Sequence, residues 1–95
     1  MVKESDFQAK IIRYLKARGC VALKYQQNAT TIAGVADIVF FKEGFYGWIE
    51  VKRAKNAPRR PGQEQFIQRM NEWSWARVVW PENWEETKKD LERIL

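Results

Sequence analysis

Two carboxylates and a lysine stand among apolar residues in the middle of the chain. Two strand-like apolar runs, 35–41 and 46–51, are separated by a short turn signal; Asp37 lies in the first run, Glu50 lies in the second, and Lys52 follows it. Taking an unpaired charge out of water costs several kcal/mol, so charged residues within strands need a partner or a role. These three residues are therefore the first candidates for chemistry.

The spacing of the two runs predicts how these charges face one another. If the chain reverses in a two-residue hairpin at 43–44, Asp37 lies directly opposite Glu50. Like charges directly opposite each other are destabilising, so such a pair implies a cation between them. Lys52 follows Glu50 by two residues, which places it on the same face of the strand. A longer turn would shift this pairing.

Two simpler interpretations compete with a metal site. The charges could project into solvent, or one acid could form an ion pair with Lys52. Three charges on one face next to a basic loop favour a metal, and carboxylate ligands favour Mg²⁺ or Mn²⁺. A protonated lysine cannot be a ligand, so Lys52 would position or activate the attacking water or stabilise charge on a phosphate.

Composition narrows the class of protein. The chain has 95 residues, which is enough for one domain, 1–95, and the apolar content of 45% favours folding. The absence of histidine excludes a histidine general base, a Ser-His-Asp triad and histidine zinc sites. A single cysteine, Cys20, permits no internal disulfide and fits a reducing compartment. With no secretory or membrane-spanning pattern, we expect an intracellular, cytoplasmic protein that does not enter membranes.

The basic charge is concentrated beside the acidic pair. The formal net charge is +5, and five cations with no acid lie between 52 and 60. We expect the basic loop 53–60 to contact phosphates, which would give sequence-independent affinity that falls with salt; a solvated surface is the alternative. The candidate nucleic-acid-binding residues are Arg53, Lys55, Arg59 and Arg60.

Hydrophobic periodicity predicts the order α-β-β-β-α-β-α, a mixed α/β domain around a central sheet. We expect helices over 4–18, from Pro61 onward and over 82–95; strands over 20–26, 35–41, 46–51 and 75–80; and a polar loop over 27–33. In the second helix the expected apolar stripe is Phe66, Ile67, Met70 and Trp73; in the last, Trp84, Leu91, Ile94 and Leu95. The tryptophans Trp73, Trp75, Trp80 and Trp84 are expected mainly in the core, with a dimer surface as the alternative.

The ordered motifs resemble those of a nuclease family. Asp37, twelve residues, then Glu50-Val51-Lys52 is similar to the D…(D/E)xK signature of the PD-(D/E)XK nucleases. The segments GVADIV, WIEVK and PGQEQF, with the opening pattern Glu4-x-x-Phe7-Gln8, resemble the small stand-alone, phage-type virus-type replication–repair nuclease (VRR-NUC) domains over nearly the whole chain. One departure is Ala36, which stands where the family usually has a proline that supplies no ligand.

This resemblance implies a restriction-endonuclease-like α-β-β-β-α-β core, with a C-terminal helix added, and metal-dependent phosphodiester cleavage. Asp37 and Glu50 would bind the catalytic metal, the carbonyl of Val51 would add a ligand, and Lys52 would be the catalytic lysine. Glu4 would bring a helix acid to the site and help to hold a second metal ion, with Asp6 as the alternative, and Gln63 would lie close to the metal site. Apart from the resemblance, Tyr25 and Asn28 are expected near the Asp37 end of the sheet, where they would line the substrate groove.

The expected function is a Mg²⁺- or Mn²⁺-dependent DNA endonuclease. The resemblance to resolvase-like relatives implies a homodimer acting on branched DNA, since a twofold dimer matches the symmetry of a Holliday junction. Two alternatives stay open: a non-catalytic nucleic-acid-binding domain on the same fold, and a restriction-type or RNA-cleaving enzyme of the same superfamily.

Overall fold

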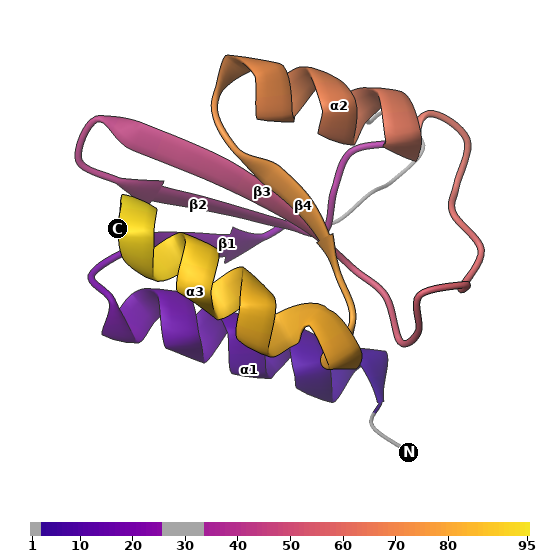
Figure 1. Cartoon of the computed structure of the whole chain (residues 1–95), viewed down its shortest axis with the longest axis horizontal. Coiled ribbons are helices and arrows are strands. Elements are labelled where there is room, and N and C mark those ends of the chain that lie inside the picture. The colour runs from indigo at the N-terminus through magenta and orange to yellow at the C-terminus, as the bar shows by residue number, and fades with distance from the viewer. Residues whose placement is uncertain (1–2, 26–33) are drawn as a thin grey trace.

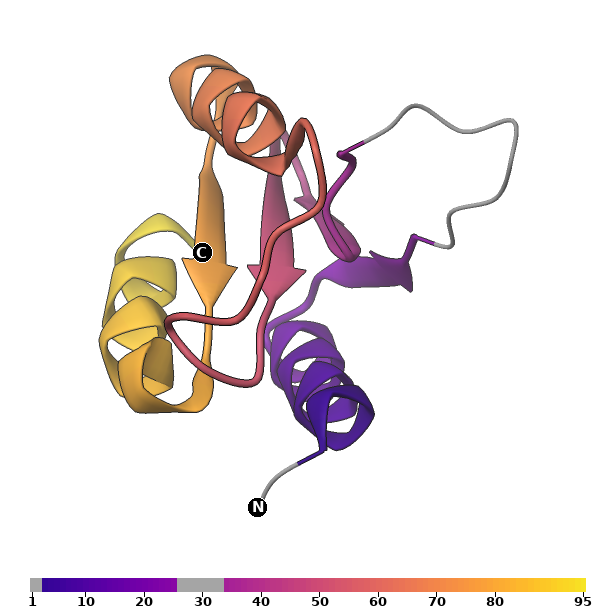
Figure 2. The same cartoon turned by 90° about the vertical axis from the view of Figure 1, so that its right-hand side faces the viewer.

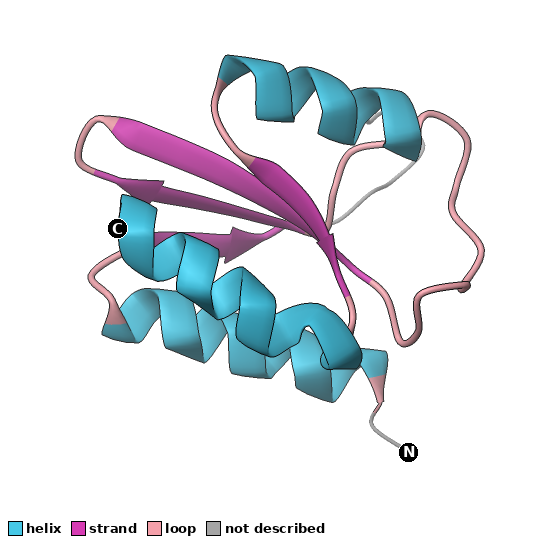
Figure 3. Cartoon of the chain, viewed as in Figure 1, coloured by secondary structure: helices cyan, strands magenta, loops and turns pink. Residues whose placement is uncertain are grey.

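A computed structural model describes residues 3–25 and 34–95 as an α/β fold with a four-stranded mixed sheet. The elements are α1 (Glu4–Ala17), β1 (Val21–Lys24), β2 (Ile38–Lys42), β3 (Phe45–Val51), α2 (Gln63–Trp73), β4 (Ala76–Val79), a 3₁₀ turn (Pro81–Asn83) and α3 (Trp84–Ile94). The predicted order of helices and strands is confirmed (Figure 3).

The strands lie side by side in the order β1-β2-β3-β4. β1, β2 and β3 form an antiparallel meander, and β4 runs parallel to β3 after the crossover through α2. Helices cover both faces of this sheet: α1 and α3 lie next to each other on one face, and α2 lies alone on the other (Figures 1 and 2). The sheet is thus the middle of three layers.

The main core lies between the sheet and the α1–α3 layer. Phe7, Ile11 and Leu15 recur at helical spacing along α1 and are buried against Ile38 and Phe40 of β2. Acids in the first turn of α1 and a lysine in its last turn complement the helix dipole. Gly19 then ends the helix in a left-handed conformation, as expected.

The central hairpin has the predicted register. Ile38 pairs with Ile49 and Lys42 with Phe45, which requires the two-residue turn at 43–44. Gly44 has a φ of 75°, a conformation that glycine adopts without the steric cost of a Cβ atom. Asp37 directly precedes β2 instead of lying within it, because β2 begins at Ile38 and not at 35.

The predicted faces of the first strand are wrong. The alternation of residue types along 20–26 predicts Val21, Leu23 and Tyr25 on an apolar inner face, but Ala22 is the buried residue of β1, and Val21 and Leu23 are exposed. α1 precedes β1 by a short turn and packs directly on it, which leaves room for a small side chain on that face. The larger apolar residues therefore point to the opposite face.

The two later helices begin later than predicted. α2 begins at Gln63, not at Pro61, because Pro61 and Gly62 form a turn in which Gly62 has a φ of 84°. Trp73 is 65% exposed, so its assignment to the core was wrong, while Phe66, Ile67 and Met70 are half-buried.

α3 also differs in part from the expected pattern. A 3₁₀ turn begins at Pro81 and precedes the helix proper. Trp84 and Leu91 are buried as predicted, whereas Ile94 is exposed. Of the other tryptophans, Trp75 is buried and Trp80 half-buried.

Cys20 and the predicted loop 27–33 remain. Cys20 is buried. The loop 27–33 and Asn28 lie outside the described residues. Within 3–25 and 34–95, no helix combines the length and the apolar character needed to cross a membrane.

Candidate active site

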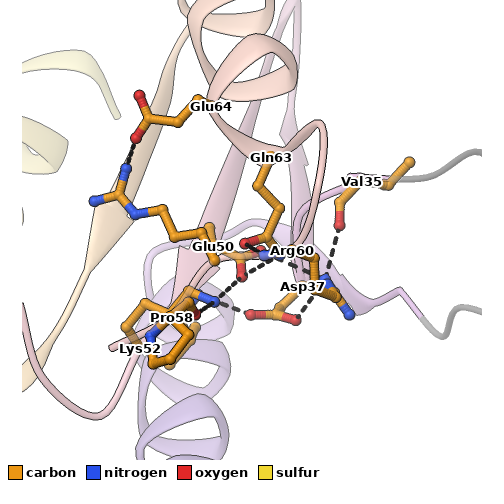
Figure 4. A network of polar contacts seen from close by, with 10 residues as sticks. Val35, Asp37, Glu50, Lys52, Pro58, Arg60, Gln63 and Glu64 are labelled. Carbon is orange, nitrogen blue, oxygen red and sulfur yellow. Dashed lines mark hydrogen bonds and ion pairs between the residues drawn. The ribbon is translucent and has the colours of Figure 1, made fainter. Parts of the chain in front are cut away.

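Glu50 lies at the centre of a polar cluster at the end of β3 (Figure 4). Alternation along β3 directs Trp48 and Glu50 to the face that α2 covers, while Ile49 and Val51 join the core. The Glu50 side chain is almost fully buried, and its Oε2 accepts a hydrogen bond from Nε2 of Gln63 at 2.7 Å. Its Oε1 is buried and accepts no hydrogen bond.

Asp37 is held beside Glu50 by the backbone of β3. Its Oδ2 accepts a hydrogen bond from the amide of Val51 at 2.8 Å. On the other side, the Asp37 carbonyl accepts a hydrogen bond from the amide of Tyr25 at 2.7 Å, which places the Tyr25 backbone near the Asp37 end of the sheet. The hairpin register and these bonds bring the two carboxylates together as the sequence predicted.

Lys52 directly follows β3 and approaches the same carboxylate. Its Nζ lies 3.1 Å from Oε2 of Glu50 and donates a hydrogen bond to the carbonyl of Pro58 at 3.0 Å. The lysine is buried, so its charge has been removed from water together with that of its partner. This contact confirms that Lys52 and Glu50 share one face.

Gln63 and Arg60 connect the basic loop to the site. Oε1 of Gln63 accepts a hydrogen bond from the amide of Arg60 at 2.9 Å, so the buried Gln63 amide bridges the loop and Glu50. Nη2 of Arg60 lies 3.8 Å from Oδ1 of Asp37 and 3.9 Å from Oε1 of Glu50. A single guanidinium therefore faces both carboxylates.

The electrostatics of Glu50 reflect this crowding. Burial raises the pKa of the Glu50 carboxyl above its usual value, and the negative charge of Asp37 raises it further. Lys52, through its hydrogen bond and its charge, and then Arg60 act in the opposite direction. Because the pKa is still raised, the local cations do not fully compensate the buried negative charge.

The other predicted site residues are less closely associated with the pair. Glu4 is the exposed first residue of α1, and the described residues contain no group of three or more His, Cys, Asp or Glu side chains able to hold a metal. The structure thus does not bring Glu4 together with Asp37 and Glu50. In the basic loop, Arg53 and Lys55 are exposed, and Arg59 forms an ion pair with Glu64.

The donor set fits a small, hard divalent ion. Glu50 offers a buried carboxylate oxygen without a hydrogen bond, and Asp37 offers Oδ1 on the same side. Mg²⁺ is commonly bound by one or two carboxylates together with waters and phosphate oxygens, so two acids suffice. Asp37 and Glu50 would hold the ion, and Val51 lies in the segment between Glu50 and Lys52 where its carbonyl could contribute.

The cluster includes contacts that the sequence pattern did not indicate. Arg60 was expected to contact phosphate, yet it faces the two acids, and its Nη2 also donates a hydrogen bond to the carbonyl of Val35 at 3.2 Å. The carbonyl of Pro58 is the second partner of Lys52. Residues 52–60 contain no acid, so the cations of this loop can form ion pairs only with acids from other segments. This was the only sequence signal for the contact between Arg60 and the two carboxylates.

Comparisons with known proteins add no identification. No protein-family model, curated protein or solved structure matches this chain. The VRR-NUC resemblance therefore stays a prediction based on the motifs of this sequence.

Proposed function

We propose that this protein is a metal-dependent nuclease of the restriction-endonuclease-like type that hydrolyses DNA phosphodiester bonds. The observation that carries the proposal is the buried Glu50 Oε1, which accepts no hydrogen bond and lies, like Oδ1 of Asp37, beside the same Arg60 nitrogen, at 3.9 Å and 3.8 Å. An antiparallel meander followed by a parallel fourth strand also suits the fold that the motifs imply.

Each residue of the cluster has a distinct task in this proposal. Asp37 and Glu50 hold a Mg²⁺ or Mn²⁺ ion, which would lower the pKa of a bound water and neutralise charge on the phosphate. Lys52 keeps its ammonium beside Glu50 and stabilises the charge that develops on the attacked phosphate. Gln63 orients the Glu50 carboxylate through its hydrogen bond to Oε2.

The basic loop supports a nucleic-acid substrate. Arg53 and Lys55 are exposed and follow Lys52 within three residues of the chain, so a bound strand would meet positive charge next to the carboxylates. Contacts of this kind bind phosphates without reading bases, so we expect cleavage to depend on DNA structure more than on sequence. Branched DNA, such as a four-way junction, is the proposed substrate class.

A homodimer is part of the same proposal. Three of the large exposed apolar side chains lie on the neighbouring strands β1 and β2: Val21 is 61% exposed, Leu23 52% and Phe41 44%. Val21 and Phe41 are direct cross-strand partners, so their side chains share one face. A twofold interface on this face would present two active sites to a symmetric junction.

The test is cleavage of supercoiled plasmid and of a synthetic four-way junction, each with Mg²⁺ or Mn²⁺. We expect wild type to cleave, and Asp37→Ala to lose roughly a hundredfold or more in rate, since the loss of a metal ligand removes the ion's contribution. Glu72→Gln removes an exposed acid on α2 and is the matched control. Equal inactivity of wild type and Asp37→Ala on both DNA substrates would overturn the DNA nuclease.

The same preparation distinguishes the alternatives. A non-catalytic binding domain would bind DNA but would show no Mn²⁺ site that Glu50→Ala removes. Activity on RNA alone, or cleavage at fixed base sequences, would instead indicate the RNA-cleaving or restriction-type member of the superfamily.

A further inference from the structure

The guanidinium of Arg60 lies beside both carboxylates of the candidate site (Figure 4). Its Nη2 is 3.8 Å from Oδ1 of Asp37 and 3.9 Å from Oε1 of Glu50, which is within ion-pair range but beyond a hydrogen bond. The same nitrogen donates its hydrogen bond to the carbonyl of Val35. Arg60 thus attracts both acids while hydrogen-bonding to neither.

The oxygens that face Arg60 are those that a divalent ion would use. Oδ2 of Asp37 is engaged by the Val51 amide, and Oε2 of Glu50 is engaged by Gln63 and Lys52. That leaves Oδ1 and Oε1 toward the guanidinium. A divalent ion bound to these oxygens would sit within a few ångströms of Nη2, and the two positive charges would repel each other strongly in such a sheltered site.

The guanidinium of Arg60 can move away from the two carboxylates without any change in the Arg60 backbone. Its side chain is 46% exposed, whereas that of Glu50 is 2% exposed. Its backbone is fixed by two hydrogen bonds with Gln63, one from the Arg60 amide to Oε1 and one from the Gln63 amide to the Arg60 carbonyl. The guanidinium can therefore turn toward solvent by side-chain rotation alone.

We infer that Arg60 is an exchangeable cation for this site. Its guanidinium stabilises the Asp37–Glu50 pair in the absence of metal. When a divalent ion binds, the guanidinium leaves its position beside the two carboxylates and turns outward to contact a DNA phosphate. The inference rests on the proposed function, because it requires a divalent ion at the two carboxylates. Arg60 is a positioning residue that couples metal binding to substrate binding.

Direct Mn²⁺ binding, measured by titration calorimetry without DNA, tests this competition. Arg60→Gln removes the competing charge, so we expect it to bind Mn²⁺ about fivefold or more tightly than wild type, the lower range of typical coupling between ligands. Arg59→Gln is the matched control: it removes the same charge from the adjacent residue, whose ion pair is with Glu64. Its Mn²⁺ affinity should stay close to that of wild type.

The possible failures are distinguishable. If wild type binds Mn²⁺ at a site that Glu50→Ala removes, but Arg60→Gln binds no more tightly than Arg59→Gln, the exchange is overturned and the proposed function stands. If no Glu50-dependent Mn²⁺ site exists in any of these proteins, the proposed function itself fails.

A second measurement needs no variant and remains decisive if Arg60→Gln does not fold. Nitrogen-15 labelling of the arginine side chains of wild type allows hydrogen exchange at the Arg60 guanidinium to be followed by NMR. We expect this exchange to accelerate when Mg²⁺ is added, while exchange at Arg59 stays unchanged. Unchanged or slower exchange at Arg60 would overturn the inference.

Discussion

At the scale of single residues, Glu50 determines what this site can do. Its carboxylate is buried beside another acid, one oxygen is held by Gln63 and Lys52, and the other accepts no hydrogen bond. A buried carboxylate without full compensation reduces stability when it is ionised, and active sites are where such groups are commonly retained. This incomplete compensation supports the proposed role of Glu50 as a ligand of a divalent ion.

The raised pKa of Glu50 gives a pH dependence of stability with a defined sign. Burial and the Asp37 charge raise the pKa of Glu50 in the folded protein above its ordinary value of 4.5. The folded state therefore holds the proton more tightly than the unfolded chain, and this stabilisation is lost as pH rises through the folded pKa. In EDTA, Glu50→Gln should become progressively more stable relative to wild type between acid and neutral pH.

Denaturant unfolding over this pH range measures the effect, with Glu72→Gln as an exposed control. The difference between wild type and Glu50→Gln should grow with pH in favour of the variant. If the difference grows in favour of wild type instead, the ionised carboxylate is stabilised by its neighbours and the pKa direction is wrong.

Gln63 is the residue that joins the loop to the site, and its removal should be costly. Its amide is buried and bonds both to Glu50 and to the backbone of Arg60. Gln63→Ala leaves the Arg60 amide without its side-chain acceptor and leaves Oε2 of Glu50 with Lys52 alone, which should lower the free energy of unfolding by about 1–3 kcal/mol. Gln68→Ala removes an exposed glutamine from the same helix and should have little effect. Similar urea midpoints for the two variants would show that the Gln63 bridge contributes little.

At the scale of elements, the segment that leads into β2 packs directly against the beginning of α2. Gly34 has a φ of 85°, and a Cβ atom there would lie 2.5 Å from the carbonyl carbon of Gly62 and 2.9 Å from the amide nitrogen of Gln63. These are backbone atoms, so a clash cannot be relieved by rotating a side chain. This close crossing holds the Asp37 segment against the helix that carries Gln63.

Gly34→Ala and Gly44→Ala form a matched pair that tests this crossing. Both glycines have positive φ, but a Cβ atom at Gly44 would meet nothing within 4 Å. Gly44→Ala should therefore cost only the backbone strain, about 1 kcal/mol. Gly34→Ala adds a backbone clash and should cost about 3 kcal/mol or more. Thermal unfolding compares the stability of the two variants. Equal losses of stability would show that the backbone at Gly34 is not packed tightly against Gly62.

At the scale of the whole molecule, the two faces of the sheet are covered unequally. α1 and α3 lie together on one face, while α2 on the other face contacts β3 and β4 (Figure 2). The apolar residues Val21, Leu23 and Phe41 lie outside the part of that face contacted by α2. This face is the proposed dimer surface.

Light scattering of variants tests the dimer surface. Leu23→Glu places a charge within the exposed apolar group and should convert a dimer into a monomer, because burying an unpaired charge in an interface is unfavourable. Trp73→Glu is the control, since Trp73 is a large apolar residue that is 65% exposed but lies on α2. If the protein stays dimeric with Leu23→Glu but becomes monomeric with Trp73→Glu, the interface lies on α2 instead.

The local pattern was sufficient to predict the hairpin and the acidic pair. Period-two alternation and a two-residue turn at 43–44 set which residues of β2 and β3 face each other, so the approach of Asp37 to Glu50 followed from spacing alone. The order of helices and strands was likewise readable, because each element carries its own periodicity. Both are local properties.

The faces of β1 and the partners of Arg60 depended on tertiary packing. β1 alternates apolar and polar residues, yet α1 packs so closely on it that the small Ala22 is buried and the larger Leu23 is exposed. Arg60 belongs to a loop without periodicity, and its position follows from the anchoring of its backbone by Gln63. Sequence by itself determined which residues could do chemistry and how two of them meet; only the packing of α2 and its loop against the hairpin decided which cation faces the pair, because that contact joins segments with no shared local pattern.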